Sequence, residues 1–224
     1  MTMQGKLIII EGIDGSGKST QYKLLCQRLA DEGAEFRKIV FPRYDNDSSA
    51  LIRMYLGGQF GERPGDVNAY AASTFYAVDR FASFNTDWKD YYNAGGLILS
   101  DRYTTSNAVH QGAKVPESEA EAYLDWLYDF EFRLLELPKP DLVIYLAIDI
   151  ETSLRQMSVR QADTHTSGDI HEKDAEYLKT CLRAGERACR HFGWRKIECV
   201  RDGSMRSVED INDEIYAAVN DILK

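Results

Sequence analysis

The feature that most constrains this chain is a glycine-rich segment near its start. The segment reads Gly12-Ile13-Asp14-Gly15-Ser16-Gly17-Lys18-Ser19 and fits the pattern G-x-x-x-x-G-K-[ST] at every fixed position. Residues 7–10 before it are all aliphatic, which is typical of a strand buried on both faces. Residues 19–30 after it repeat apolar side chains at helical spacing. This order predicts a turn whose backbone N–H groups and helix N-terminus converge on one anion.

The same segment predicts how the chain would bind a nucleoside triphosphate. Lys18 would reach the β- and γ-phosphates, and the hydroxyl of Ser19 would ligate Mg²⁺. The residues expected at ATP are Gly12, Asp14, Gly15, Ser16, Gly17, Lys18, Ser19 and Thr20. GTP-binding switch proteins share such a loop, but this sequence has no N-K-x-D or T-K-x-D element that would read guanine.

Further apolar runs indicate how a sheet is built around that first strand. Strands are expected at 38–41, 97–99 and 142–148, with a weaker one at 196–200. Short apolar runs separated by helical segments predict a parallel sheet covered on both faces. We therefore expect an α/β fold of the three-layer α/β/α kind found in P-loop NTPases. A five-stranded parallel sheet would be surrounded by helices and a short lid.

The helical segments are bounded by proline, by glycine or by polar residues. Residues 66–84 contain neither glycine nor proline and are expected to form one helix. Pro116 opens another helix, which ends before Pro138. Residues 207–224 have one apolar face and predict an amphipathic helix. The polar span 161–171 is expected to be a mobile loop.

Composition limits the class of ligand and the compartment. The 27 Lys and Arg residues against 36 Asp and Glu residues give a net charge of −9, which argues against binding nucleic acid or an anionic membrane through bulk charge. A signal peptide and an apolar stretch of about 18 residues are both missing from the sequence, so a soluble cytoplasmic protein is expected. The four cysteines have no C-x-x-C spacing and should be reduced and mostly buried.

From residue 6 to about residue 200 the chain resembles the thymidylate kinases, which are nucleoside monophosphate kinases that phosphorylate dTMP. Four features carry the resemblance through their order and spacing: Glu11 to Thr20, Phe41-Pro42-Arg43, Tyr76 with Arg80, and Asp101-Arg102-Tyr103 followed by Ser106 and His110-Gln111-Gly112. The resemblance implies a single kinase domain over 1–224, with an acceptor-binding insertion at about 43–95 and a lid at about 155–175.

The resemblance also implies roles for residues that follow the strands. Arg43 and Arg102 would hold the phosphate of dTMP, because ligands bind past the carboxyl ends of strands in an open parallel sheet and a planar guanidinium matches phosphate. Asp101 would organise the water shell of Mg²⁺ or the acceptor, so the metal is expected at Ser19 and Asp101. Asp14 would contact the 3′-hydroxyl of the sugar.

One helix face is expected to hold the base of the acceptor. Tyr76 and Arg80 are spaced i, i+4 and project from one side of a helix. The resemblance implies that the tyrosine ring stacks on the pyrimidine and that the guanidinium reaches a carbonyl of the base. Phe41, Ser106 and Gln111 complete the expected acceptor residues.

Two departures from the family pattern affect these expectations. His110 stands where the family usually has a tyrosine or phenylalanine that helps to exclude the ribose 2′-hydroxyl. Members without an arginine in the phosphate loop, where this chain has Gly15, supply a catalytic arginine from the lid. The lid element D-R-x-E reads Asp169-Ile170-His171-Glu172 here, so the catalytic cation is expected at Arg160 or, as second choice, at Arg155.

These observations lead to a hypothesis with three alternatives. The chain would transfer the γ-phosphoryl group of MgATP to dTMP, giving ADP and dTDP for dTTP synthesis, through alignment and charge neutralisation by Lys18, Mg²⁺, Arg102, Asp101 and a lid arginine. A deoxynucleoside kinase or another nucleoside monophosphate kinase on the same fold stays open, as does an ATP-dependent switch or regulatory ATPase. The expected partners are dTMP, ATP and a second copy in a homodimer, with no nucleic acid or membrane.

Overall fold

Five strands of this computed structural model form one parallel sheet in the order β2-β3-β1-β4-β5. The structure describes the backbone of residues 5–164 and 175–224 and the side chains of residues 5–159 and 176–224. The strand bounds are β1 Lys6–Gly12, β2 Phe36–Val40, β3 Leu97–Asp101, β4 Leu142–Ala147 and β5 Arg195–Glu198. β1 lies at the centre and is buried along its whole length after its first residue, as its aliphatic run requires. The five-stranded parallel sheet expected from the sequence is confirmed.

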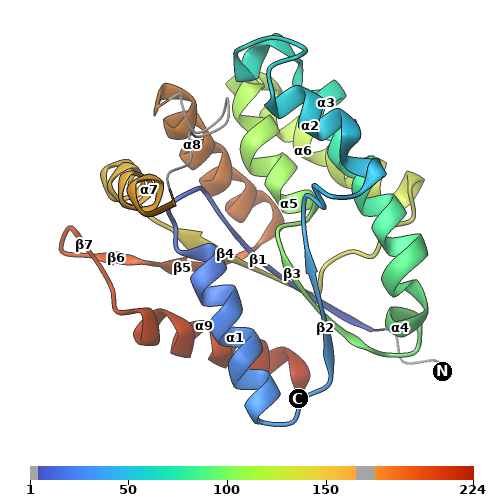
Figure 1. Cartoon of the computed structure of the whole chain (residues 1–224), viewed down its shortest axis with the longest axis vertical. Coiled ribbons are helices and arrows are strands. Elements are labelled where there is room, and N and C mark those ends of the chain that lie inside the picture. Colours follow the sequence, from blue (N-terminus) through green and yellow to red (C-terminus); the bar gives the residue numbers. More distant parts are fainter. Residues whose placement is uncertain (1–4, 165–174) are drawn as a thin grey trace.

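Helices cover both faces of the sheet and give three layers (Figure 1). α1 and α9 pack against each other on one face, and α3, α6 and α8 lie on the other. The helix bounds are α1 Lys18–Asp31, α2 Ala50–Leu56, α3 Ala69–Ser83, α4 Lys89–Asn93, α5 Thr104–Ser106, α6 Ala120–Tyr128, α7 Ile150–Thr164, α8 Ala175–Phe192 and α9 Val208–Leu223. Within the described residues, none of these helices is both long and apolar enough to cross a lipid bilayer.

Side-chain caps decide where two of the helices begin. The Asn68 side chain accepts a hydrogen bond from the backbone N–H of Ala71 at 2.8 Å, so α3 begins at residue 69 and not at residue 66 as predicted. In α9, the Ser207 hydroxyl oxygen accepts from the backbone N–H of Asp210 at 3.1 Å. The prediction missed the first boundary because it used the absence of glycine and proline as its only signal.

Three further predicted elements differ from the structure. β5 ends at Glu198, and the residues after it form a hairpin of β6 (Val200–Arg201) and β7 (Ser204–Met205), because Asp202 and Gly203 both have positive φ and turn the chain back. The helix after Pro116 is divided into a short 3₁₀ turn, α6 and a π-helical turn over Asp129–Leu134. α7 continues to residue 164, so the first residues of the expected loop are helical, and the rest of that loop lies outside the described residues.

The order of the strands brings distant segments to one edge of the sheet. β1 pairs with β3 on one side and with β4 on the other, all in parallel, so their carboxyl ends lie together. The glycine-rich loop follows β1, Phe41 follows β2, and Arg102 follows β3. In an open parallel sheet this edge is where ligands bind.

Candidate active site

The glycine-rich loop is braced from outside by α7. Gly15 and Gly17 both adopt a φ of 79°, a left-handed conformation that glycine allows without strain. A Cβ at Gly15 would lie 2.6 Å from the carbonyl oxygen of Ser153 in α7, and the Ser153 hydroxyl donates to the carbonyl oxygen of Asp14 at 2.7 Å. The structure therefore leaves no room for a side chain at this loop position.

A cavity lies against this loop and is lined by seven of the eight residues predicted to bind ATP. Those seven are Asp14, Gly15, Ser16, Gly17, Lys18, Ser19 and Thr20. Gly12 lies behind them, and a Cβ there would approach the hydroxyl oxygen of Ser16 to 2.6 Å. The contiguous residues 13–20 thus supply eight of the sixteen residues that line this cavity, which we call the donor cavity.

Lys18 is buried at the start of α1 beneath this loop. Burial lowers the pKa of its ammonium group, and the positive charge of Arg102 lowers it further, while Asp14, Asp101 and Glu11 act in the opposite direction. An anionic ligand in the donor cavity would add negative charge beside this ammonium group and so favour its charged form.

The hydroxyl of Ser19 and the carboxylate of Asp101 face each other across the loop. Ser19 Oγ lies 3.4 Å from Asp101 Oδ2, and Asp101 Oδ1 is buried with no hydrogen-bond partner among the described residues. Among those residues, no group of three His, Cys, Asp or Glu side chains is placed to hold a metal ion. One hydroxyl and one carboxylate fit Mg²⁺, which takes few protein ligands and completes its shell with phosphates and water.

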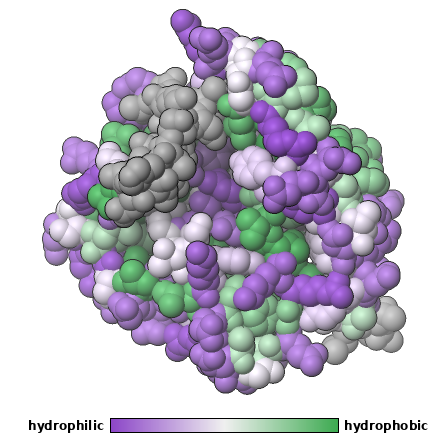
Figure 2. Space-filling model, viewed as in Figure 1, coloured by the Kyte–Doolittle hydropathy of each residue, from purple (hydrophilic) through white to green (hydrophobic). Residues whose placement is uncertain are grey.

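A second cavity, which we call the acceptor cavity, lies beside the donor cavity. Eight of the nine residues predicted for the acceptor line it: Asp14, Phe41, Tyr76, Arg80, Arg102, Ser106, His110 and Gln111. Pro42, Tyr44, Leu56, Tyr103 and Asn107 line it as well. The two cavities share Asp14, Phe41, Pro42, Tyr44 and Arg102 as a common wall. Figure 2 shows a hollow on this side of the molecule whose visible lining is largely hydrophilic.

Tyr44 and Asn107 were not predicted from the sequence. Each directly follows a predicted residue, Arg43 and Ser106 respectively, so adjacency to the motifs was the available signal. The Gln111 side chain is buried at the acceptor cavity, and its Oε1 has no hydrogen-bond partner among the described residues. Such an atom is a candidate to receive a hydrogen bond from a ligand.

Arg102 is fixed from several sides between the two cavities. Its Nη2 donates to Asp14 Oδ1 at 2.7 Å, and its Nη1 lies 3.3 Å from Ser106 Oγ, 3.0 Å from His110 Nε2 and 3.8 Å from Glu11 Oε1. Burial alone would lower the pKa of the guanidinium, but the carboxylates around it, with Asp14 first, raise the pKa above its ordinary value. Arg102 is therefore a permanent and well-oriented positive charge.

His110 supports Arg102 from within the protein. A guanidinium can only donate hydrogen bonds, so His110 Nε2 accepts from Arg102 and the ring proton lies on Nδ1. That Nδ1 lies 3.7 Å from Cys181 Sγ, and the Tyr177 hydroxyl donates to the backbone oxygen of His110 at 2.6 Å. The imidazole thus contacts Arg102 through Nε2 and Cys181 of α8 through Nδ1.

Arg80 reaches the acceptor cavity with its guanidinium held by a buried carboxylate. Its Nε and Nη2 donate to the two oxygens of Glu131 at 2.6 and 2.5 Å, and its Nη1 lies 3.3 Å from the carbonyl oxygen of Tyr103. Burial would lower the pKa of Arg80, but Glu131 raises it. Glu131 was not predicted from the sequence, although its position between Phe130 and Phe132 was a signal of a buried carboxylate.

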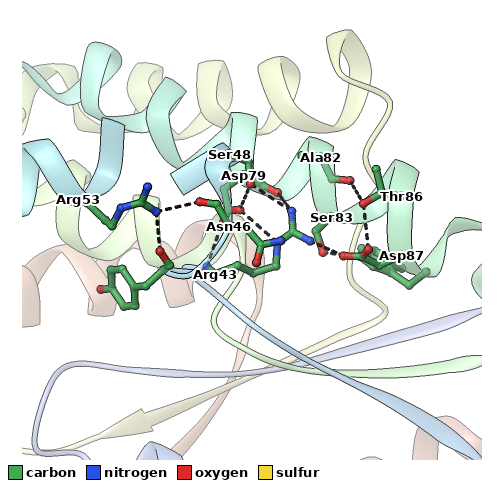
Figure 3. Close-up of polar contacts among 11 residues, drawn as sticks. Arg43, Asn46, Ser48, Arg53, Asp79, Ala82, Ser83, Thr86 and Asp87 are labelled. Carbon is green, nitrogen blue, oxygen red and sulfur yellow. Dashed lines mark hydrogen bonds and ion pairs between the residues drawn. The ribbon is translucent and has the colours of Figure 1, made fainter. Parts of the chain in front are cut away.

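Arg43 is the one predicted acceptor residue that the structure does not bring to the cavity. Its guanidinium is bound by the carboxylates of Asp79 and Asp87 and by the hydroxyl of Ser48 (Figure 3). Tyr44, the next residue along the chain, lines both cavities instead. This arrangement gives no support to the expectation that Arg43 holds the phosphate of the acceptor.

The two arginines expected at the lid belong to α7. Arg155 is exposed, and its Nη2 lies 3.3 Å from Thr152 Oγ1 of the same helix. Arg160 has its backbone in α7, but its side chain lies outside the described side chains. The segment 169–172, with His171 near the expected family arginine, also lies outside the described residues.

Comparison with known proteins shows the family of this chain. The family model described as "Thymidylate kinase" matches residues 10–203, which include the glycine-rich loop and every residue of both cavities except Met205. The chain belongs to the thymidylate kinase family.

Relatives within the thymidylate kinase family cover 76% to 97% of the chain. The thymidylate kinase of Mycobacterium tuberculosis (strain ATCC 25618 / H37Rv) is 34% identical over 172 residues, covering 76% of this chain and 79% of that protein. A probable thymidylate kinase of Thermococcus onnurineus (strain NA1) is 30% identical over 223 residues, covering 97% of this chain and 98% of that protein. The solved thymidylate kinase of Candida albicans has a TM-score of 0.69 and 21% identity, covering 97% and 92% of the two chains, and shares the fold.

Proposed function

We propose that this thymidylate kinase family member transfers the γ-phosphoryl group of MgATP to dTMP, giving ADP and dTDP. The observation that carries the proposal is the common wall of the two cavities, which includes Asp14, Tyr44 and Arg102. A donor in the phosphate loop and an acceptor in the second cavity would meet at this wall. Direct transfer needs that proximity, and holding both substrates there supplies much of the rate enhancement.

On the donor side, the phosphate loop would hold ATP through its backbone N–H groups and Lys18. Ser19 and Asp101 would hold Mg²⁺, which when bound supplies neutralisation of charge on the β- and γ-phosphates. Phosphoryl transfer requires no covalent enzyme intermediate. The residues therefore act by positioning the triphosphate and by stabilising the charge that develops during transfer.

On the acceptor side, Arg102 would hold the phosphate of dTMP, and Asp14 would both orient Arg102 and face the sugar. Tyr76 and Arg80 line the cavity from α3, where a pyrimidine would stack on the ring and meet the guanidinium. Glu131 accepts from Nε and Nη2 of Arg80, so Nη1 is the nitrogen of this guanidinium that Glu131 leaves for the base. A cation from the lid, Arg160 or Arg155, would complete the charge around the transferred group.

The reaction can be tested by measuring ADP release from MgATP against dTMP, dUMP, UMP, CMP, GMP and thymidine. The proposal expects turnover with dTMP, and weaker turnover with dUMP because one methyl group in an apolar pocket discriminates by roughly 10–200-fold. Equal ADP release without any acceptor would instead favour a regulatory ATPase. Turnover of thymidine above that of dTMP would favour a nucleoside kinase.

Arg102→Ala separates these alternatives further. Hydrogen bonds to charged groups contribute about 1.5–3 kcal/mol, so loss of the arginine should weaken kcat/KM for dTMP by roughly 10–150-fold. An acceptor without a phosphate should lose much less. An equal loss with thymidine as acceptor would contradict the assignment of Arg102 to the phosphate.

We further propose that the protein works as a cytoplasmic homodimer. Its four cysteines are free and buried, which favours a reducing compartment.

Tyr70, Val78 and Phe81 of α3 and nearby Leu134 are large apolar side chains with exposures of 41, 51, 45 and 57%. In Figure 2, hydrophobic surface follows the edge where Figure 1 places α2, α3 and α6. Light scattering should give twice the chain mass, and Phe81→Glu should give a monomer; a monomeric wild type would contradict the proposal.

A further inference from the structure

The turn that follows β2 is fastened to α3 by one arginine. We propose that Arg43 is a positioning residue that locks this turn onto α3 and thereby shapes the acceptor cavity, and that it does not itself contact the phosphate of dTMP. The inference rests on the proposed function for its substrate. We call the contacts among Arg43, Ser48 and Asp79 the turn clamp.

In the turn clamp, the backbone and the side chain of Arg43 both bind the carboxylate of Asp79. The backbone N–H of Arg43 donates to Asp79 Oδ2 at 2.9 Å, and its Nε donates to Asp79 Oδ1 at 3.2 Å. The Ser48 hydroxyl donates to Asp79 Oδ1 at 2.7 Å, and Arg43 Nη2 lies 3.2 Å from Ser48 Oγ. Two positions of the turn, 43 and 48, are thus fixed to one point of α3 (Figure 3).

The guanidinium of Arg43 has little freedom to serve a second purpose. Its Nη1 binds the Asp87 carboxylate, and its Nη2 also lies 3.4 Å from the backbone oxygen of Asp79, so all three of its nitrogens have protein partners. Asp79 is only 1% exposed. Moving Arg43 to a substrate would leave that buried carboxylate without its cation, and an unpaired buried charge is costly.

The clamp connects two walls of the acceptor cavity. The turn carries Phe41, Pro42 and Tyr44, which line both cavities, and α3 carries Tyr76 and Arg80, which line the acceptor cavity. Asp79 is the helix residue directly before Arg80, so a contact at Asp79 sets where the turn lies relative to these side chains.

A second arginine supports the turn without entering the clamp. Arg53 of α2 donates from Nη1 to the backbone oxygen of Asn46 at 2.8 Å and also to that of Tyr44 (Figure 3). The turn is therefore tied to α2 through its carbonyl groups and to α3 through Arg43. These contacts give Tyr44 a fixed backbone although its side chain is 48% exposed.

The kinetic test compares Arg43→Met, Asp79→Asn, the double variant and Ser48→Ala, with the KM for dTMP and the Ki for thymidine as readouts. Residues that act through one contact have coupled effects. Arg43→Met and Asp79→Asn should each raise both constants by roughly tenfold, and the double variant should match the single variants within about twofold. Ser48→Ala should shift both constants in the same direction by about threefold. Arg28→Met, which breaks the pair with Asp213 on α9, is the matched control and should change neither constant.

Three results would overturn the clamp. An increase in KM for dTMP without an increase in Ki for thymidine would mean that Arg43 contacts the phosphate directly. Wild-type constants in both Asp79→Asn and Ser48→Ala would mean that the clamp does not shape the cavity. Multiplied effects in the double variant would mean that the two residues act separately.

Hydrogen exchange tests the clamp without any substrate, so its outcome is independent of the proposed reaction. Asp79→Asn leaves one side-chain acceptor oxygen where the carboxylate offers two, so the backbone N–H and Nε of Arg43 can no longer both be bound. Exchange of the backbone amides of residues 43–49 should become at least about tenfold faster than in the wild type. Exchange at the wild-type rate in a folded variant would contradict the clamp. A wild type that fails to phosphorylate dTMP would contradict the proposed function and leave this measurement valid.

Discussion

The donor cavity and the acceptor cavity share a wall but are built in different ways. The donor cavity takes half of its lining residues from the contiguous segment 13–20, and the backbone shapes that segment through two glycines with left-handed φ. The acceptor cavity takes side chains from the ends of β1, β2 and β3, from α3 and from the helical turns after Arg102. A binding site made by local backbone can be identified from a short motif, whereas a site made by distant side chains depends on the whole fold.

The arginines of the acceptor region show this dependence most clearly. Arg80 and Arg102 lie in the cavity with carboxylates that orient them, Glu131 and Asp14. Arg43 follows a strand in the same way as Arg102, yet Asp79 holds its guanidinium elsewhere. The position of an arginine after a strand therefore does not decide its role. The carboxylate that binds its guanidinium decides it.

The largest effect should come from removing the carboxylate behind Arg80. Glu131→Ala leaves an arginine that is 2% exposed without its partner, and loss of one member of a buried pair destabilises a protein by about 3–5 kcal/mol. Glu131→Gln, which keeps the shape and one acceptor, should lose less. Urea unfolding measures both variants. Equal and small losses in the two variants would show that Arg80 does not depend on Glu131.

The second prediction separates the two cavities by kinetics. Lys18→Met should lower kcat by roughly 10²–10³-fold, because it removes a preorganised positive charge from the transferred phosphoryl group. The KM for dTMP should change by less than about threefold, because Lys18 is not among the residues that line the acceptor cavity. Steady-state rates at saturating ATP measure both constants. A large increase in KM for dTMP would show that the cavities are not separable in this way.

The sheet and the glycine-rich loop could be predicted from the sequence, but several residues of the acceptor cavity and their partners could not. The strands could be predicted because buried parallel strands are continuous aliphatic runs, and β1 is such a run. Tyr44, Asn107 and Glu131 were missed because their roles follow from neighbours that are distant in sequence: Glu131 meets Arg80 across 51 positions. The clamp on Arg43 could not be predicted for the same reason, since nothing in a single sequence indicates which of 36 acidic residues pairs with which arginine.

The third prediction concerns the support of Arg102 within the acceptor region. His110→Phe removes the acceptor for Arg102 Nη1, and loss of one such hydrogen bond costs about 0.5–1.5 kcal/mol, so the KM for dTMP should rise by roughly 2–12-fold. His110→Gln can place an acceptor oxygen near the position of Nε2 and should restore most of the affinity. Wild-type affinity in His110→Phe, or failure of His110→Gln to improve on it, would contradict the positioning of Arg102 by His110.

The smallest effect concerns how the free energy of unfolding depends on pH through Lys114. Lys114 Nζ donates to the Tyr55 hydroxyl at 2.6 Å and to the backbone oxygen of Val67 at 3.1 Å, and burial lowers its pKa to about 7. Between pH 7 and the ordinary lysine pKa of 10.5, the unfolded chain then binds more protons at this position than the folded protein does.

The free energy of unfolding should therefore rise with pH above 7 in the wild type relative to Lys114→Met. The cost of burying the ammonium group is fully present below pH 7, where both states are protonated, and it is relieved as the folded group loses its proton. Because Lys114 is partly exposed, the expected gain is a few tenths of a kcal/mol per pH unit. Urea unfolding of both proteins at pH 7, 8 and 9 measures this difference. A difference that stays constant or falls with pH would show that Lys114 keeps its proton in the folded protein over this pH range.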